Sequence, residues 1–223
     1  MPSRSRRSYD QFCAIARALD SVGDRWTLLI VRELLAGPRR YTDLHADLPG
    51  VSTDVLASRL KHMEGEGLAE RRRQARPGAG HVYELTARGR ELLPVLSALS
   101  DFGAPALGKP RPTDAVRAHW WAVPLRTALE AALADMVGSP PGEPGGVVDV
   151  RLPEGAFHVR LGEQGPPWGE GAAPQRADAG LELDSEACAR LAEGSATLAD
   201  AIRAGSVRVT GEGPVAEALR PAG

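Results

Sequence analysis

One segment, residues 26–85, has the pattern of three successive helices followed by a strand hairpin, and this order constrains the fold more than any other feature. Apolar residues of its first element repeat at helical spacing, at Trp26, Leu29 or Ile30, and Leu34. Gly37-Pro38 ends that run, because proline has no amide donor. The pattern predicts a helix-turn-helix followed by a wing.

The third helix of this segment is expected to be the recognition helix. Pro49-Gly50 forces a turn and Ser52 suits an N-cap, after which Leu56, Leu60 and Met63 share one helical face. A recognition helix enters the major groove, where base edges are displayed. We therefore predict DNA contacts from polar residues of this helix and of the short helix before it. They are Thr42, Ser52, Thr53, Asp54, Ser58, Arg59, Lys61 and His62.

Two short strands, residues 69–73 and 81–85, flank a loop at residues 74–80 and form the expected wing. Guanidinium groups match phosphate oxygens and are drawn to a narrow minor groove. The predicted wing contacts are Arg71, Arg72, Arg73, Arg76 and His81. A run of charges can equally be a solvated surface. Its position directly after a helix-turn-helix favours the nucleic-acid interpretation.

Short motifs in this region closely resemble the HxlR family of bacterial winged-helix transcription regulators. They are the segments 22–30, 37–41, 48–52, 56–60, 66–68 and 83–86, together with Gly89. The resemblance covers roughly residues 10–105. It implies a homodimer, joined by the first helix and the helix after the wing, that presents two recognition helices to an inverted-repeat operator in double-stranded DNA.

The chain has only two cysteines, Cys13 and Cys188, so it has no disulfide framework and no Cys-x-x-Cys spacing for a zinc or redox centre. This usage fits a reducing cytoplasm. Cys13 falls where many members of the resembled family keep a cysteine, and some of those members sense oxidants with it. It is a candidate redox switch, and the alternative is a small buried apolar residue beside Phe12. No metal or cofactor is expected.

The N-terminal residues 1–9 contain Arg4, Arg6 and Arg7 without a following apolar stretch, so we expect a disordered basic arm rather than a signal peptide. No run approaches the roughly 18 apolar residues of a membrane span. The expected location is the cytoplasm.

Charge divides the chain. Residues 1–111 hold 18 Lys and Arg against 13 Asp and Glu, whereas residues 112–223 hold 9 against 16. The basic half can bind a polyanion such as DNA. The acidic half would be repelled by a polyanion, so we expect it to lie away from DNA or to serve another purpose. A Pro/Gly-rich stretch lies between them. The expected domains are a winged-helix DNA-binding and dimerisation domain at 10–104, a linker at 105–116, and an α+β domain at 117–223.

A helix is expected after Thr86, reaching Phe102. Pro94 would either kink this helix or mark a first turn, and the family resemblance favours the kink. The second half then reads as a helix at 120–137, a hairpin of strands around 148–152 and 157–161, a loop around Trp168, and further strands and helices. Ser185 and a Thr197-x-x-Asp200 capping box are expected to start two of these helices.

This second half resembles the sterol-carrier-protein-like fold. The matching residues are 181–191, Gly194, 198–202, Gly205, 207–211 and Leu219. The resemblance implies a cavity for a hydrophobic or aromatic small-molecule effector. Trp120 and Trp168 are the candidate pocket residues, whereas Trp121 and Phe157 are expected in the core. A purely structural role for this half is the alternative.

The expected fold class is therefore α+β, with a winged helix-turn-helix domain before a smaller α+β domain. Gly211-x-Gly213-x-x-Ala216 imitates a dinucleotide fingerprint but lacks the following strand and acidic residue, and the histidines show no metal-ligand spacing. We find no catalytic constellation, so an enzyme is not expected. The predicted function is a DNA-binding transcription regulator, a repressor acting as a homodimer. The alternative is a carrier of hydrophobic ligands.

Overall fold

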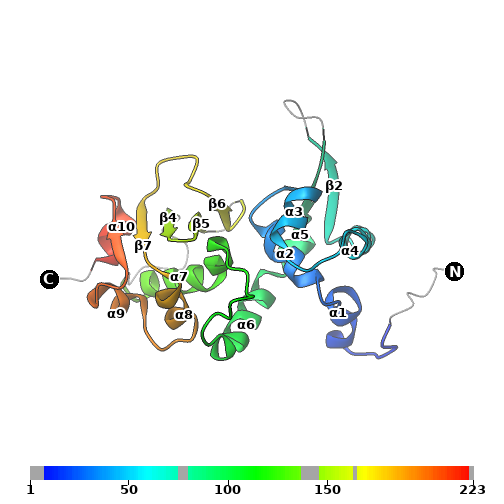
Figure 1. The fold of residues 1–223 in the computed structure, drawn as a ribbon, viewed down its shortest axis with the longest axis horizontal. Coiled ribbons are helices and arrows are strands. Elements are labelled where there is room, and N and C mark those ends of the chain that lie inside the picture. Colours follow the sequence, from blue (N-terminus) through cyan, green and yellow to red (C-terminus); the bar gives the residue numbers. More distant parts are fainter. Residues whose placement is uncertain (1–7, 75–79, 137–145, 163–164, 221–223) are drawn as a thin grey trace. The chain divides into compact units, whose positions relative to one another are not determined.

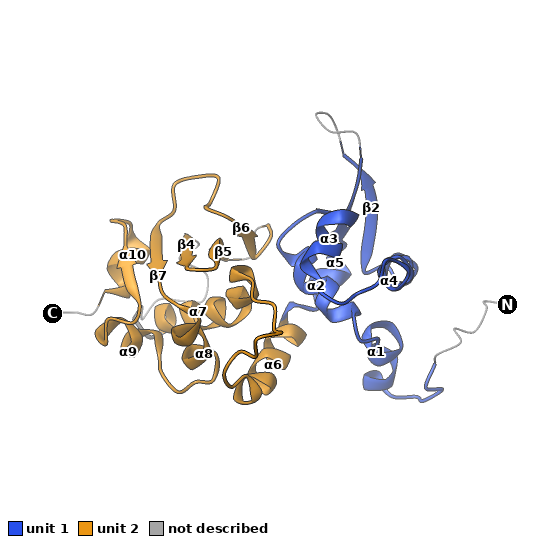
Figure 2. Cartoon of the chain, viewed as in Figure 1, with its two compact units in different colours: residues 1–93 blue, residues 94–223 orange. Residues whose placement is uncertain are grey.

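The computed structural model describes residues 8–74, 80–136, 146–162 and 165–220. The chain divides into two compact units, Met1–Leu93 and Pro94–Gly223 (Figure 2). Both units combine helices with strands, so the mixed class that the sequence predicts is confirmed. Figure 1 labels the elements in chain order.

The first unit contains a helix-turn-helix core. Its helices are α1 (Ala14–Val22), α2 (Thr27–Leu35), α3 (Tyr41–Asp47), α4 (Thr53–Gly65) and α5 (Ala87–Arg90). Apolar side chains at helical spacing form its core, with Ile30 rather than Leu29 facing inward on α2 and Leu44 buried on α3. Leu56, Leu60 and Met63 of α4 are buried, as predicted.

Local signals fix both ends of α4. The Ser52 hydroxyl accepts a hydrogen bond from the Val55 amide at 3.3 Å, which satisfies one of the orphan amides of the first turn. At the other end Gly67 has a φ of 67°, and the Leu68 amide donates to the Met63 carbonyl at 2.9 Å. This left-handed cap returns the chain directly into the wing.

The wing consists of β2 (Ala69–Arg73) and β3 (His81–Leu85), which are antiparallel, with the bounds that the sequence predicts. A third strand that the sequence analysis missed, β1 (Arg39–Arg40), pairs with the other side of β3. The order β1-β3-β2 places β3 in the centre. The wing is therefore joined by backbone hydrogen bonds to the segment that links α2 and α3.

The kinked single helix expected after Thr86 is wrong, and the alternative, Pro94 in a first helical turn, is confirmed. Thr86 caps only the short helix α5, and a separate helix α6 (Leu93–Gly103) follows, with Pro94 as its second residue. Proline is tolerated in a first helical turn, where its missing amide has no partner to lose. The compact units divide at the start of α6, whereas the sequence analysis assigned this helix to the DNA-binding domain.

The second unit is a five-stranded sheet with accompanying helices. Its helical elements are η1 (Ala104–Ala106), η2 (Ala118–Trp121), α7 (Ala122–Met136), α8 (Ser185–Ala192), α9 (Leu198–Arg203) and α10 (Pro214–Leu219). Its strands are β4 (Gly146–Leu152), β5 (Gly155–Leu161), β6 (Trp168–Glu170), β7 (Ala179–Glu182) and β8 (Arg208–Thr210). The strand order is β6-β5-β4-β7-β8, and β4 pairs in parallel only with β7.

The core of this unit lies between one sheet face and α7. Val148 and Val150 of β4 are fully buried, as are Leu125 and Leu129 of α7. The alternation along β4 leaves Asp149 and Arg151 on the other face. The hairpin predicted from this alternation is confirmed by the antiparallel pairing of β4 with β5.

Two local expectations for this unit need correction. Trp168 lies in strand β6 and not in a loop, and its side chain is buried because β6 pairs along the edge of β5. The N-cap of α8 is Asp184 rather than Ser185, since the Asp184 carboxylate accepts from the Ala187 amide at 2.8 Å. The capping box of Thr197 with Asp200 is confirmed at the start of α9.

Candidate nucleic-acid interface

The outer face of α4 carries a row of exposed polar side chains. Ser52, Thr53, Asp54, Ser58 and Lys61 are all exposed, on the side opposite the buried Leu56 and Met63. Hydroxyl, carboxylate and ammonium groups at this spacing can pair with base edges and phosphates. Five of the predicted recognition-helix residues therefore share a solvent-facing surface.

Arg59 does not share that surface, and its prediction as a DNA contact is wrong. The residue is only 8% exposed, and its guanidinium forms an ion pair with Asp24, which precedes α2. Arg59 follows Leu56 by three residues and therefore falls on the inner helical face. It fixes the recognition helix to the segment between α1 and α2.

His62 also points inward. The imidazole Nε2 lies 3.2 Å from the Ser21 carbonyl oxygen, and the ring is half-buried. The Ser21 hydroxyl donates to Glu66 at 2.6 Å, one turn further along. The end of α1 is thus hydrogen-bonded to the last turn of α4, and His62 helps to position that helix.

The preceding helix α3 supports the first turn of α4. The Tyr41 hydroxyl donates to the Thr53 carbonyl oxygen at 2.7 Å. Thr42, the predicted contact on this helix, is exposed, and its hydroxyl donates to Asp43 at 3.3 Å. The exposed threonine lies one residue beyond the tyrosine that holds the two helices together.

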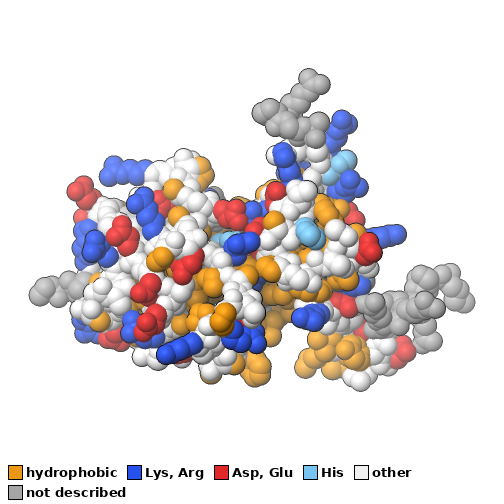
Figure 3. Space-filling view, viewed as in Figure 1, with side chains coloured by type: hydrophobic (Ala, Val, Ile, Leu, Met, Phe, Trp, Pro, Cys, Tyr) orange, Lys and Arg blue, Asp and Glu red, His pale blue; other side chains and the backbone are white. Residues whose placement is uncertain are grey.

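The wing presents its cationic residues from one side of a two-stranded ribbon. Arg71 lies opposite Tyr83 and Arg73 lies opposite His81, so these side chains alternate with that of Arg72. Arg71, Arg73 and His81 are exposed, and Figure 3 shows basic side chains gathered along these strands. Arg76 lies outside the described residues.

Arg72 is engaged on the opposite side of the ribbon, where its Nε lies 2.7 Å from Glu84. Sequence reasoning placed it with the other wing arginines, but the pleat directs it toward this carboxylate. Arg71 has a different neighbour, since its charge lies close to Tyr83. Burial raises the pKa of Tyr83 and the Arg71 charge opposes that rise, so the phenol remains a neutral donor near neutral pH.

Arg40 is a further candidate contact that the sequence analysis did not single out. Its side chain is exposed and donates to the Gln74 side-chain oxygen at 3.3 Å, at the start of the wing loop. The pairing of β1 with β3 brings it there. A two-residue strand has too little periodicity to be predicted, and Gly37-Pro38 ahead of it was the one available signal.

The remaining candidate residues lie elsewhere. Cys13 is exposed in the single chain, at the residue before α1. Trp168 is 1% exposed and Trp120 is half-buried, and neither lines the pocket of about 510 Å³ in the second unit.

Within the described ranges, no group of three acidic, cysteine or histidine residues is arranged to bind a metal ion. No described helix has the length and apolarity needed to cross a membrane.

A helix-turn-helix with an exposed polar recognition helix, followed by a cationic hairpin, defines a winged helix-turn-helix DNA-binding protein. Residues 21–110 match the model of the HxlR-like helix-turn-helix family. An uncharacterized HTH-type transcriptional regulator of Synechocystis is 39% identical over 92 residues, which cover 41% of this chain and 68% of that protein. The chain belongs to the HxlR-like helix-turn-helix family and is a transcriptional regulator.

Other relatives also match less than half of the chain. An uncharacterized HTH-type transcriptional regulator of Mycobacterium bovis is 37% identical over 107 residues, covering 48% of this chain and 67% of that protein. The solved structure of the transcriptional regulator YodB of Bacillus subtilis, in its reduced form, is 26% identical and covers 45% of this chain and all of that one, with a TM-score of 0.39.

Proposed function

We propose that this regulator binds an inverted-repeat operator as a homodimer and represses transcription by occupying a promoter. The observation that carries the proposal is the exposed polar face of α4, which runs from Ser52 to Lys61 beside a wing bearing Arg71 and Arg73. Repression of this kind needs no contact with the polymerase, because a dimer bound across the promoter excludes it sterically.

Dimerisation is supported by apolar side chains that the described chain leaves uncovered. On and before α1, Phe12 is fully exposed and Ile15 is 71% exposed. On α6, Phe102 is 86% exposed and Leu99 is 45% exposed. Large apolar groups in solvent are costly, since a fully buried Phe or Leu contributes roughly 1.5 to 3 kcal/mol. These are also the two helices that the family resemblance assigns to the dimer.

The domain roles follow from this arrangement. We assign residues 10–104 to DNA binding and dimerisation, 105–116 to a linker and 117–223 to an effector domain. A sterol-carrier-protein-like fold for the last segment is supported by the order of β7, α8, α9 and β8, by turns at Gly194 and Gly205 with positive φ, and by Gly211 after β8. A ligand for that domain acts by differential affinity for the two operator-binding states.

The first experiment identifies the operator. Genomic fragments retained by the purified full-length chain are sequenced, with the promoter beside its own gene as the first candidate, and the recovered site is footprinted. Two recognition helices require half-sites about 10 bp apart or a multiple of that spacing. In vitro transcription from the same fragment should fall as protein is added. A footprint over one half-site with one bound chain would contradict the dimer.

The dimer surface is tested separately by replacing Phe12 or Phe102 with serine. Either change should shift the chain toward a monomer in sedimentation velocity and weaken binding to the full operator. Val116→Ser is the matched control, because Val116 is 37% exposed and lies outside both the proposed dimer surface and the recognition helix. Unchanged sedimentation of both phenylalanine variants would exclude these helices as the interface.

A further inference from the structure

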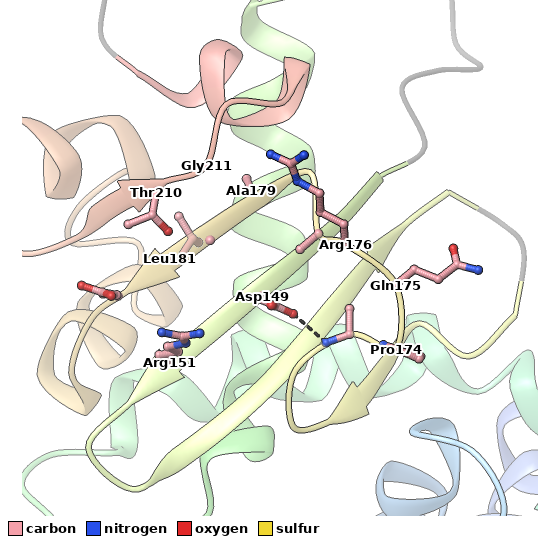
Figure 4. Close-up of a pocket in the computed structure, with 13 residues that line it drawn as sticks. Asp149, Arg151, Pro174, Gln175, Arg176, Ala179, Leu181, Thr210 and Gly211 are labelled. Carbon is pink, nitrogen blue, oxygen red and sulfur yellow. Dashed lines mark hydrogen bonds between the residues drawn. The ribbon is translucent and has the colours of Figure 1, made fainter.

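The second unit has an open pocket on the sheet face that points away from α7 (Figure 4). Its volume is about 510 Å³, within the range of roughly 300 to 1,000 Å³ typical of small-molecule sites. Polar groups from the three strands β4, β7 and β8 and from a connecting segment surround it, chiefly Asp149, Arg151, Gln175, Arg176, Glu182 and Thr210. This chemistry differs from the apolar cavity expected from the sequence.

The space exists because one strand position lacks a side chain. Asp149, Gly180 and Thr210 lie side by side across β4, β7 and β8. A Cβ atom at Gly180 would lie 2.4 Å from the Thr210 Oγ1 atom. Glycine therefore leaves open the floor between an acidic residue and a hydroxyl.

One wall of the pocket is the segment of residues 171–178, which we call the strap. The Ala173 amide donates to the Asp149 carboxylate at 2.8 Å, and this bond appears as the dashed line in Figure 4. At the far end, the Asp178 amide donates to the Val147 carbonyl oxygen and the Val147 amide donates to the Asp178 carboxylate, each at 2.8 Å. The strap is thus held to β4 at two points, so the pocket is formed before any ligand binds.

The charged groups of the pocket are not equally engaged. Asp149 accepts the strap amide, and Glu182 lies 3.7 Å from Arg208 on the neighbouring strand. Arg151 and Arg176 form no salt bridge with any residue of the described ranges. One extends from β4 and the other from the strap, on two sides of the open space (Figure 4). The pocket therefore offers two guanidinium groups that have no carboxylate of the described residues within salt-bridge distance, although Asp149 and Glu182 also line it.

We propose that this pocket binds a small organic anion, whose carboxylate or phosphate group is held by Arg151 and Arg176. Guanidinium remains charged at every physiological pH and pairs with either oxyanion through parallel hydrogen bonds. The Thr210 hydroxyl and the Gln175 amide supply further hydrogen-bonding groups at the rim. In a half of the chain with excess negative charge, these two arginines provide the local attraction for an anion.

The test is calorimetric titration of the full-length chain with benzoate, phenyl phosphate and benzamide in low-salt buffer. At least one anion should bind saturably at one site per chain, and comparison of the two identifies the preferred oxyanion. Benzamide matches benzoate in shape without its charge and should not bind. Saturable binding of neither anion, or equal binding of benzamide, would overturn the proposal.

Arginine variants locate the site. Arg151→Gln and Arg176→Gln should each weaken anion binding at least tenfold, whereas Arg190→Gln should change it less than twofold. All three arginines are exposed, and Arg190 lies on α8 outside the pocket lining, so the control removes the same charge from the same unit. Equal weakening by Arg190→Gln would refute a specific pocket. Operator binding is measured on the same samples. Loss of anion binding alone would contradict the pocket proposal, and failure to bind an operator alone would contradict the proposed regulatory function.

Discussion

The carboxylate of Asp24 forms an ion pair with the guanidinium of Arg59, the one charged side chain on the buried face of the recognition helix among the described residues. The pair connects the turn before α2 to the middle of α4. The Arg59 side chain is 10% exposed and that of Asp24 is 32% exposed, so solvent only partly screens their attraction.

Replacing Arg59 with alanine should destabilise the first unit by roughly 1 to 3 kcal/mol, less than a fully buried pair would lose, because Asp24 retains some solvent. Denaturant unfolding measures this change. Operator affinity should fall with unchanged dependence on salt, since no phosphate contact is removed. Arg88→Ala, on the exposed surface of α5, is the control. A weaker dependence of operator affinity on salt for Arg59→Ala would indicate that Arg59 contacts DNA.

We expect α4 to make the sequence-specific base contacts and the wing to make the contacts with the DNA phosphates. Ser58→Ala or Lys61→Ala should alter the preference among operator variants by roughly 1 to 3 kcal/mol where a base contact is lost. Arg73→Ala and Arg76→Ala should weaken all duplexes alike and reduce the salt slope by about one. Fluorescence anisotropy with single-base operator variants measures both effects. An unchanged slope and affinity for both arginine variants would exclude the wing.

Gly89 should not tolerate a side chain. A Cβ atom there would lie 2.0 Å from the Leu68 carbonyl oxygen, which is backbone and cannot rotate away. Gly89→Ala should therefore cost roughly 1 to 3 kcal/mol of unfolding free energy. Gly65→Ala is the matched change in α4, where no atom lies within 4 Å, and it should instead stabilise by about 0.5 to 1 kcal/mol. Equal effects of the two changes would contradict this packing.

The capping box at the start of α9 predicts a pH dependence. The Thr197 side chain donates a hydrogen bond that lowers the pKa of Asp200, with the Thr197 amide and Arg203 adding to the effect. A carboxyl group whose pKa is lower in the folded state stabilises that state at pH values above its unfolded pKa of about 3.9. This stabilisation is lost as the pH falls through the folded-state pKa. Asp200→Asn should lower the melting temperature at pH 7 but much less at pH 3. Glu212→Gln, at an exposed carboxylate, is the control, and an equal loss at both pH values would contradict the linkage.

The two cysteines should differ sharply in reactivity. Cys13 is exposed, whereas Cys188 is fully buried and burial raises its pKa, which keeps its thiol protonated. Native protein should therefore take up one equivalent of iodoacetamide at Cys13, and unfolded protein should take up two. Mass spectrometry of the labelled peptides assigns the sites. Undiminished native labelling of the Cys13→Ser variant would show that Cys188 is accessible.

The regular elements could be predicted because each carries its own local signal. The strands of the wing and the inward row of Leu56, Leu60 and Met63 follow from periodicity alone. A contact between two residues that are distant in the sequence could not be predicted in this way. Arg59 looks like a surface residue until Asp24 is placed beside it, 35 positions earlier.

The second unit shows the same limit. Its hairpin and capping box follow from alternation and from the Thr-x-x-Asp spacing. The pocket depends on three strands meeting in one register, so that Gly180 lies between Asp149 and Thr210. Neither the parallel pairing of β4 with β7 nor the return of the strap over Asp149 has a local signature in the sequence.

Because β3 is the central strand of the three-stranded sheet β1-β3-β2, β2 is an edge strand of that sheet, and one side of its backbone pairs with no other described strand. Such an edge is a template for pairing with strands of other molecules, and charged side chains are a common protection against it. Arg71, Arg72 and Arg73 occupy three of the five positions of β2. Neutralising them together would remove a barrier to aggregation, so solubility must be followed alongside DNA affinity in any multiple-arginine variant.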